Sequence, residues 1–200
     1  MSRSSGPAEV ASVTEHAAES LLFIRHAMER GSTFSAVPGL GGAMRGGIGL
    51  AAAAISASPP TTERWLAVWL LAAAAALTVG VIAMRRKAAR LGARLAGAPA
   101  RRFAMGLSAP LVAGAVVTMG LWMHGVWALM PAVWLLLYGA GVLTGGAFSV
   151  APMRLLGGCF MALGLAAVVT PPAWGNVWLA LGFGVLQVGF GIYIARKHGG

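Results

Sequence analysis

Six apolar stretches follow one another along the chain, and charged residues, prolines or glycine-rich turns separate them. A helix of about 20 apolar residues crosses a hydrocarbon core about 30 Å thick. The lengths of these stretches therefore predict an all-α polytopic membrane protein with six transmembrane helices. The predicted spans are residues 37–57, 65–84, 103–123, 127–150, 154–169 and 177–195.

The region before the first span has a different pattern. Between residues 8 and 30 the apolar side chains recur at helical spacing, while Glu15, Glu19 and His26 fall on other faces. This spacing predicts an amphipathic helix that is too polar to span a membrane. Such a helix either lies on the cytoplasmic leaflet or docks against a partner, and its mixed charge favours docking. We therefore divide the chain into an N-terminal region, residues 1–36, and a transmembrane domain, residues 37–200.

The composition supports a lipid-facing surface. Hydrophobic residues make up 58% of the chain and charged residues only 10%, whereas a soluble domain carries about 25% charged residues. The net charge of +10 would suggest nucleic acid in a soluble protein. Here the basic residues gather at helix ends and in one loop, as expected beside anionic lipid headgroups. We therefore expect no nucleic-acid partner.

The charges also predict an orientation. Residues 85–102 hold seven of the fifteen lysines and arginines and no acidic residue. Short loops rich in lysine and arginine stay in the cytoplasm, so this basic loop predicts an N-in, C-in topology. Tryptophan favours membrane interfaces, and all seven tryptophans fall at or near the predicted external ends of the spans. They are Trp65, Trp69, Trp122, Trp127, Trp134, Trp174 and Trp178.

The side chains needed for catalysis are scarce. The chain has no aspartate, and no glutamate lies inside a predicted span. Proton-coupled carriers usually relay protons through carboxylates or histidines in the membrane. Facing histidines for haem, metal-binding Cys/His spacings and nucleotide-binding glycine motifs are also missing from the sequence. We therefore expect a protein that is not an enzyme and has no cofactor or metal, with Cys159 as a small buried hydrophobe.

A few polar side chains remain as candidates for function. Arg45 lies inside the first predicted span, where a charge costs about 2.5–3.5 kcal/mol. Its side chain either extends back to the interface or contacts a lipid headgroup, substrate or partner. Gln187, in the middle of the sixth span, is an interhelical hydrogen-bond link or a ligand group. A basic stripe on a cytoplasmic extension of the second helix is a candidate lipid contact, formed by Arg86, Arg90 and Arg94.

Small residues mark the faces where membrane helices approach closely. The fourth span offers Gly141, Gly145 and Ser149 at four-residue spacing. The sixth span offers Gly182 and Gly189 on one face, and further glycines on the opposite face suggest that this helix is sandwiched between neighbours. These faces predict either ordinary bundle packing or an interface of a homo-oligomer or partner.

Three segments resemble a family of uncharacterised bacterial six-helix inner-membrane proteins. They are FIRHAMER at residues 23–30, FSAVPGLGG at residues 34–42 and TGGAFSV at residues 144–150. The resemblance covers about a fifth of the chain. It implies a multi-pass protein of the bacterial inner membrane, without an established activity, whose genes lie near winged-helix regulators. A regulatory partnership would follow from that setting.

Two functions of different kinds are consistent with these features. The first is a non-enzymatic bundle that anchors or regulates a cytoplasmic partner through residues 8–30 and the basic loop. The second is a small transporter or lipid-handling protein, without carboxylate-based proton coupling, with Arg45 and Gln187 near its path. The missing intramembrane carboxylates favour the first.

Overall fold

The computed structural model describes residues 19–21, 24, 37–58, 61–91 and 97–198. The chain divides into two compact units, residues 1–33 and 34–200. In the first unit the described residues are helical and exposed; they are Glu19, Ser20, Leu21 and Ile24. The rest of the predicted amphipathic helix lies outside the described residues.

The regular elements of the second unit are helices throughout its described part. Six helical runs follow one another, and the last changes its pitch along its length. They are α2 (Gly39–Ile55), α3 (Thr62–Arg90), α4 (Ala98–Met123), α5 (Met130–Gly146, after the short turn η1 at Trp127–Leu129), α6 (Ala151–Val169), and the last run, composed of η2 (Pro172–Trp174), α7 (Gly175–Leu179), the π-helical η3 (Ala180–Leu186) and α8 (Gln187–His198).

Five of these runs are long and apolar enough to cross a membrane, as in a multi-pass helical membrane protein. Their mean hydropathies, taken over the most apolar part of each, range from 1.6 to 2.4. The exception is α2, which has 17 residues and is about 25 Å long at 1.5 Å per residue. It is a shorter apolar helix than the other five.

Several helix ends differ from the predicted span ends. The second helix continues to Arg90 and α4 already begins at Ala98, because a helix can project beyond the apolar layer into water. α5 stops at Gly146, and α6 begins at Ala151 with a proline in its first turn, where the missing N–H has no partner to lose. A turn at His124–Gly125 follows α4, and Gly125 has a φ of 69°, a conformation that glycine adopts readily.

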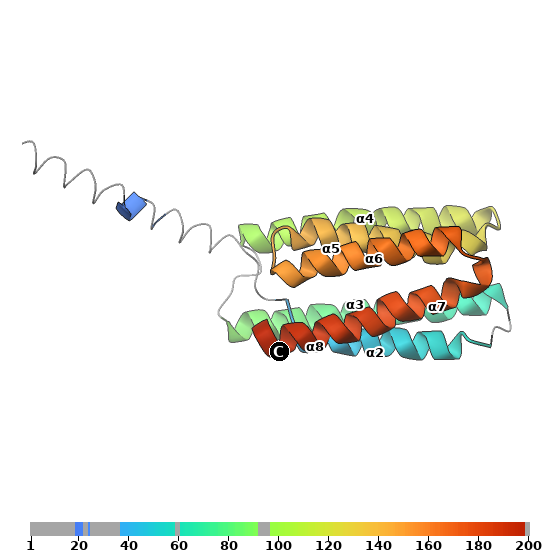
Figure 1. The fold of residues 1–200 in the computed structure, drawn as a ribbon, viewed down its shortest axis with the longest axis horizontal. Coiled ribbons are helices and arrows are strands. Elements are labelled where there is room, and N and C mark those ends of the chain that lie inside the picture. Colours follow the sequence, from blue (N-terminus) through green and yellow to red (C-terminus); the bar gives the residue numbers. More distant parts are fainter. Residues whose placement is uncertain (1–18, 22–23, 25–36, 59–60, 92–96, 199–200) are drawn as a thin grey trace, which may run out of the picture. The chain divides into compact units, whose positions relative to one another are not determined.

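The helices form two groups of three (Figure 1). One group contains α4, α5 and α6, with α5 packed against both of its sequence neighbours. The other contains α2, α3 and the last helical run, in which α2 packs against both partners. The last run also contacts α5 and α6, so it joins the two groups.

The glycines of the last run explain how it fits between its neighbours. A methyl group at Gly182 would lie 2.5 Å from a side-chain carbon of Leu135 on α5. On the opposite face of the last run, a methyl group at Gly184 would lie 2.5 Å from a side-chain carbon of Leu50 on α2. A methyl group at Gly191 would overlap the backbone of Ala43, also on α2. The last run therefore is sandwiched between α5 and α2, as the two glycine faces suggested.

An aromatic cluster fills the space where the two groups meet. The ring of Tyr138 on α5 lies 4.7 Å from the ring of Phe160 on α6 and 5.0 Å from the ring of Phe183 in η3. Phe160 is fully buried, as are Leu135 and Leu179. Aromatic pairs at such distances contribute about 0.5–1.5 kcal/mol beyond the area they bury.

Candidate functional sites at the two ends of the bundle

The described cations of the bundle gather at one end, with Arg64 as the exception. They lie near the start of α2, the end of α3, the starts of α4 and α6, and the end of α8. These helix ends lie on the same side of the bundle (Figure 1). Most of these side chains are exposed: Arg85, Arg86, Arg90, Arg101, Arg102, Arg154, Arg196 and Lys197. We refer to these eight residues as the basic end.

The predicted basic stripe lies partly within this end. Arg86 and Arg90 are on the last turns of α3 and both are exposed. Arg94 lies outside the described residues. A cation at a helix C-terminus also interacts favourably with the helix dipole, so the sequence places these arginines where they stabilise α3 as well as offer charge to a partner.

Lys87 behaves differently from its neighbours, and the sequence did not reveal it. Its side chain is 5% exposed, and its ammonium group donates a hydrogen bond of 2.9 Å to the carbonyl of Val37. A buried ammonium needs such acceptors. This bond connects the end of α3 to the residues that precede α2. Periodicity alone does not separate Lys87 from the exposed arginines beside it.

Arg45 lies on α2 at the interface with α3. A methyl group at Gly80 of α3 would lie 3.4 Å from the Arg45 Cδ atom, an ordinary van der Waals distance, so the arginine side chain lies close to this face of α3. The end of the side chain turns back toward Gly42, as expected for a helical side chain leaning toward the N-terminus. Its Nε atom is buried and has no hydrogen-bond partner among the described residues.

Gln187 lies in the interior of the bundle, 4% exposed. Its amide nitrogen donates a hydrogen bond to the hydroxyl of Tyr138 on α5. This is the geometry of an interhelical link, one of the two roles considered for Gln187. The preceding π-helical segment carries Phe183, which packs against Tyr138, and such segments occur often at functional sites.

The predicted packing residues have different surroundings. Methyl groups at Gly141 and Gly145 would lie 3.2 Å and 3.0 Å from carbonyl oxygens of Leu107 and Phe103 on α4. Ser149 lies beyond the end of α5 and is buried. Gly189 has open space around it, so its position in the seven-residue spacing does not produce a contact within the described bundle, whereas Gly182 is tightly packed.

The tryptophans lie at the opposite end of the bundle, where Asn176 connects three helices. Its side-chain oxygen accepts hydrogen bonds from the indole N–H groups of Trp65 and Trp69 on α3, at 3.4 Å and 3.2 Å. Its amide nitrogen donates a bond of 2.9 Å to the carbonyl of Ala53 on α2. Trp65 also stacks on Trp134, with ring centroids 5.5 Å apart. One asparagine therefore joins α7 to α2 and α3.

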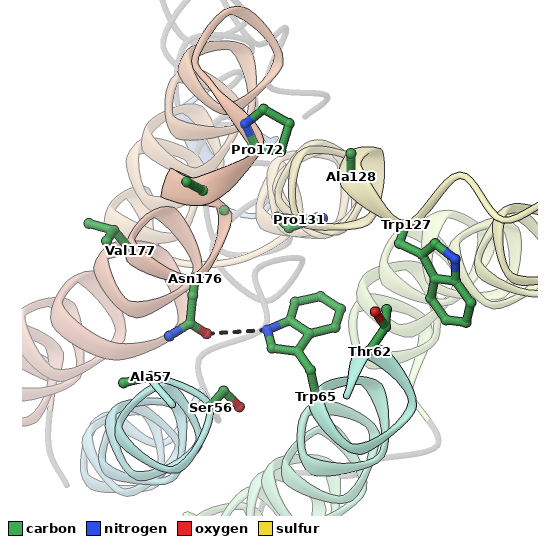
Figure 2. A pocket seen from close by; sticks show the side chains of 12 residues that line it. Ser56, Ala57, Thr62, Trp65, Trp127, Ala128, Pro131, Pro172, Asn176 and Val177 are labelled. Carbon is green, nitrogen blue, oxygen red and sulfur yellow. Dashed lines mark hydrogen bonds between the residues drawn. The ribbon is translucent and has the colours of Figure 1, made fainter. Parts of the chain in front are cut away.

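A hollow of about 420 Å³ opens beside Asn176. It lies between the end of α2 and the starts of α3, α5 and α7 (Figure 2). Its walls are tryptophan, proline, alanine and valine side chains with three polar side chains, and no charged residue lines it. The lining residues are Ser56, Ala57, Thr62, Trp65, Trp127, Ala128, Pro131, Pro172, Ala173, Gly175, Asn176 and Val177.

Ser56 is the polar lining residue without a partner. Its side chain is 5% exposed, and its hydroxyl oxygen is buried without a hydrogen bond to the described part of the chain. Figure 2 shows it on the side of α2 that faces Trp65. Most buried polar groups are hydrogen-bonded, so this buried hydroxyl is an exception among the described residues.

Metal-binding and nucleophilic groups add little to these sites. Within the described ranges, no three histidine, cysteine, aspartate or glutamate side chains lie close enough to hold a metal ion. Cys159 is a free, partly buried thiol on α6.

Comparison of the chain with protein-family models, curated proteins and solved structures finds no match. The resemblance of residues 23–30, 34–42 and 144–150 to an uncharacterised bacterial family therefore stays a prediction. The function has to be argued from the geometry of the two ends of the bundle.

Proposed function

We propose that this chain is a bacterial inner-membrane protein that anchors or regulates a cytoplasmic protein partner without catalysing a reaction. In this proposal α2 is a sixth span, since 17 residues are at the lower limit for crossing a bilayer. Both termini of the bundle then lie in the cytoplasm. The partner contacts residues 8–30 together with the basic end.

The observation that supports the proposal is the separation of charge and tryptophan between the two ends of the bundle. Eight exposed cations crowd one end of the bundle, where the described residues of the second unit offer no carboxylate to neutralise them; Glu63 lies at the other end, on α3. Cytoplasmic connections carry such an excess of positive charge. An acidic partner surface placed against it would gain from charge complementarity, which speeds association and selects the partner.

Removing residues 1–31 from the full chain is expected to reduce the amount of co-purifying protein partner at least tenfold. Reversing the charge of Arg86 and Arg90 together, by substituting glutamate for both, should reduce it severalfold, because two attractive contacts become repulsive. The measurement is quantitative mass spectrometry of proteins recovered with the tagged chain in mild detergent. Arg64→Glu, at the opposite end, is the charge-matched control and should recover as much partner as the unmodified chain.

The same preparations report whether the variants insert and which way they face. In a Cys159→Ser background, a single cysteine at Arg90 should resist a membrane-impermeant thiol reagent applied to intact cells, while one at Trp174 should react. Partner recovery that is unchanged by the deletion, in correctly inserted protein, would contradict the proposal. Labelling at Arg90 from outside would contradict the orientation on which it depends.

A lipid-handling role is the second candidate, and the environment of Arg45 is the observation that favours it. A buried guanidinium nitrogen without a hydrogen bond costs about 1–3 kcal/mol or more. A phosphate oxygen is the acceptor that arginine binds most readily at a membrane surface. Such a headgroup would bind at the Arg45 guanidinium, which lies near Gly42 of α2 and Gly80 of α3.

Arg45→Gln is expected to reduce the phosphatidylglycerol retained by the purified protein about fivefold or more, because the charge-assisted hydrogen bonds are lost. Native mass spectrometry of the protein in mixed lipid and detergent micelles measures the retained lipid. Arg64→Gln removes one exposed arginine at the other end and should leave retention unchanged. Equal retention by both variants would remove the support for the second candidate.

A further inference from the structure

We infer that the hollow at the tryptophan end is a binding site for an uncharged amphiphile that carries a hydroxyl or carbonyl oxygen. The inference goes beyond the proposed partner role and does not depend on it. It concerns the end of the bundle opposite the basic end, and it is argued from the lining of the hollow and from the buried Ser56 hydroxyl, which has no partner among the described residues.

The size and walls of the hollow fit a small organic ligand. Its volume of about 420 Å³ falls in the range of about 300–1,000 Å³ that is usual for such sites. Aromatic and apolar side chains line most of it, with a few polar groups at one side, which is the usual composition of a ligand pocket. Trp65 is held in place by its stacking on Trp134, so this wall is already formed.

The hydrogen-bonding groups set the chemistry of the ligand. Asn176 uses its oxygen for two indole groups and one amide N–H for Ala53, so a second N–H is available to a ligand oxygen. The Ser56 hydroxyl, buried and without a described partner, both donates and accepts. A ligand hydroxyl or carbonyl that reached both groups, after a rotation of the Ser56 side chain toward the hollow, would satisfy them together. No side chain in the lining carries a charge, and burying an unpaired ion is costly, so the ligand is neutral.

The location supplies the apolar part of the ligand. Tryptophans favour the level of lipid headgroups, and two of them, Trp65 and Trp127, line the hollow. A molecule with an apolar tail and a neutral polar head therefore reaches the hollow from the interface, with its head near Ser56 and Asn176 and its apolar part along Pro131 and Trp127 (Figure 2).

A photoreactive decanol tests this assignment on the full chain in phosphatidylcholine nanodiscs. Saturable crosslinking to peptides that contain residues 56–65 and 172–177 is expected, and unlabelled decanol should compete for it. Decanoate, which has the same tail with a charged head, should compete at least tenfold more weakly. Crosslinking that does not saturate, that spreads over the lipid-facing helices, or that decanoate suppresses equally would overturn the assignment.

Variants of the lining separate the hollow from the lipid surface. Ala57→Trp, just beyond the end of α2, fills the hollow and should abolish saturable crosslinking, while Ala54→Trp, at an exposed position on α2, should bind like the unmodified chain. Ser56→Ala should weaken decanol binding about three- to tenfold through the loss of one hydrogen bond. Ala128→Trp fills the hollow from the opposite wall and replaces Ala57→Trp if that variant does not elute as a single species. Saturable crosslinking that persists in a folded hollow-filling variant would refute the site.

Discussion

Gly49→Ala is expected to destabilise the bundle by about 1–3 kcal/mol, the usual range for an overpacked core. A methyl group at Gly49 on α2 would overlap the backbone carbonyl of Phe183 in the π-helical segment η3. Backbone cannot move aside as a flexible side chain can, so α2 and the last helical run would have to separate. The expected observation is a lower temperature for the loss of monodisperse elution after heating in detergent.

Gly47→Ala is the matched control on the same helix. A methyl group at Gly47 has open space within 4 Å, and alanine favours a helix over glycine by up to about 1 kcal/mol. This variant should therefore be as stable as the unmodified chain or slightly more stable.

Gly157→Ala and Gly158→Ala form a second pair of test and control, on α6. A methyl group at Gly157 would lie 2.5 Å from the backbone nitrogen of Leu143, whereas one at Gly158 has open space. Equal stability within either pair would contradict the packing described here.

Asn176→Leu is expected to cost about 1–3 kcal/mol, the usual penalty for leaving buried hydrogen-bonding groups without a partner. Leucine is of similar size but cannot form hydrogen bonds. The substitution therefore leaves two indole N–H groups and the carbonyl of Ala53 without their partner. Because Asn176 joins α2, α3 and α7, the same thermal measurement should report the loss, and tryptophan fluorescence should change as the indole surroundings relax.

Trp69→Phe tests whether the effect comes from these hydrogen bonds. It removes one of the two indole donors, so the double variant with Asn176→Leu should lose less than the sum of the single losses. Trp174→Phe is the control, because Trp174 is nearby but 53% exposed, and its stability should be unchanged. Additive losses for Asn176 and Trp69 would show that the bond between them contributes little.

The sequence predicts the number of helices well and their neighbours poorly. Length and hydropathy locate each helix because lipid requires an apolar span. They do not tell which helices touch, since lipid-facing and buried positions are both apolar. Small residues are the remaining signal, and they predicted the sandwiched last helix through Gly182, Gly184 and Gly191. The contacts that group α4 with α5 and α6 extend along the length of these helices, and no short sequence pattern predicts them.

The candidate sites were predictable where a residue type is rare in its setting. Arg45 and Gln187 are polar residues in apolar stretches, so the sequence draws attention to both. Lys87 was missed because it sits among exposed arginines, and its burial depends on the carbonyl of Val37, a partner distant in sequence. The hollow was missed for a related reason: Ser56 and Asn176 belong to different helices, and only the packing of their ends brings them to one wall.

The central position of the last helical run has a consequence for how the protein is made. α2 emerges from the ribosome first among the described helices, yet the glycine face at Gly46 and Gly49 packs against a segment translated after all the others. Until that segment is translated, α2 lacks the partner that covers this face. Premature termination would leave the face uncovered, so incomplete chains offer membrane quality-control proteases a feature that finished chains conceal.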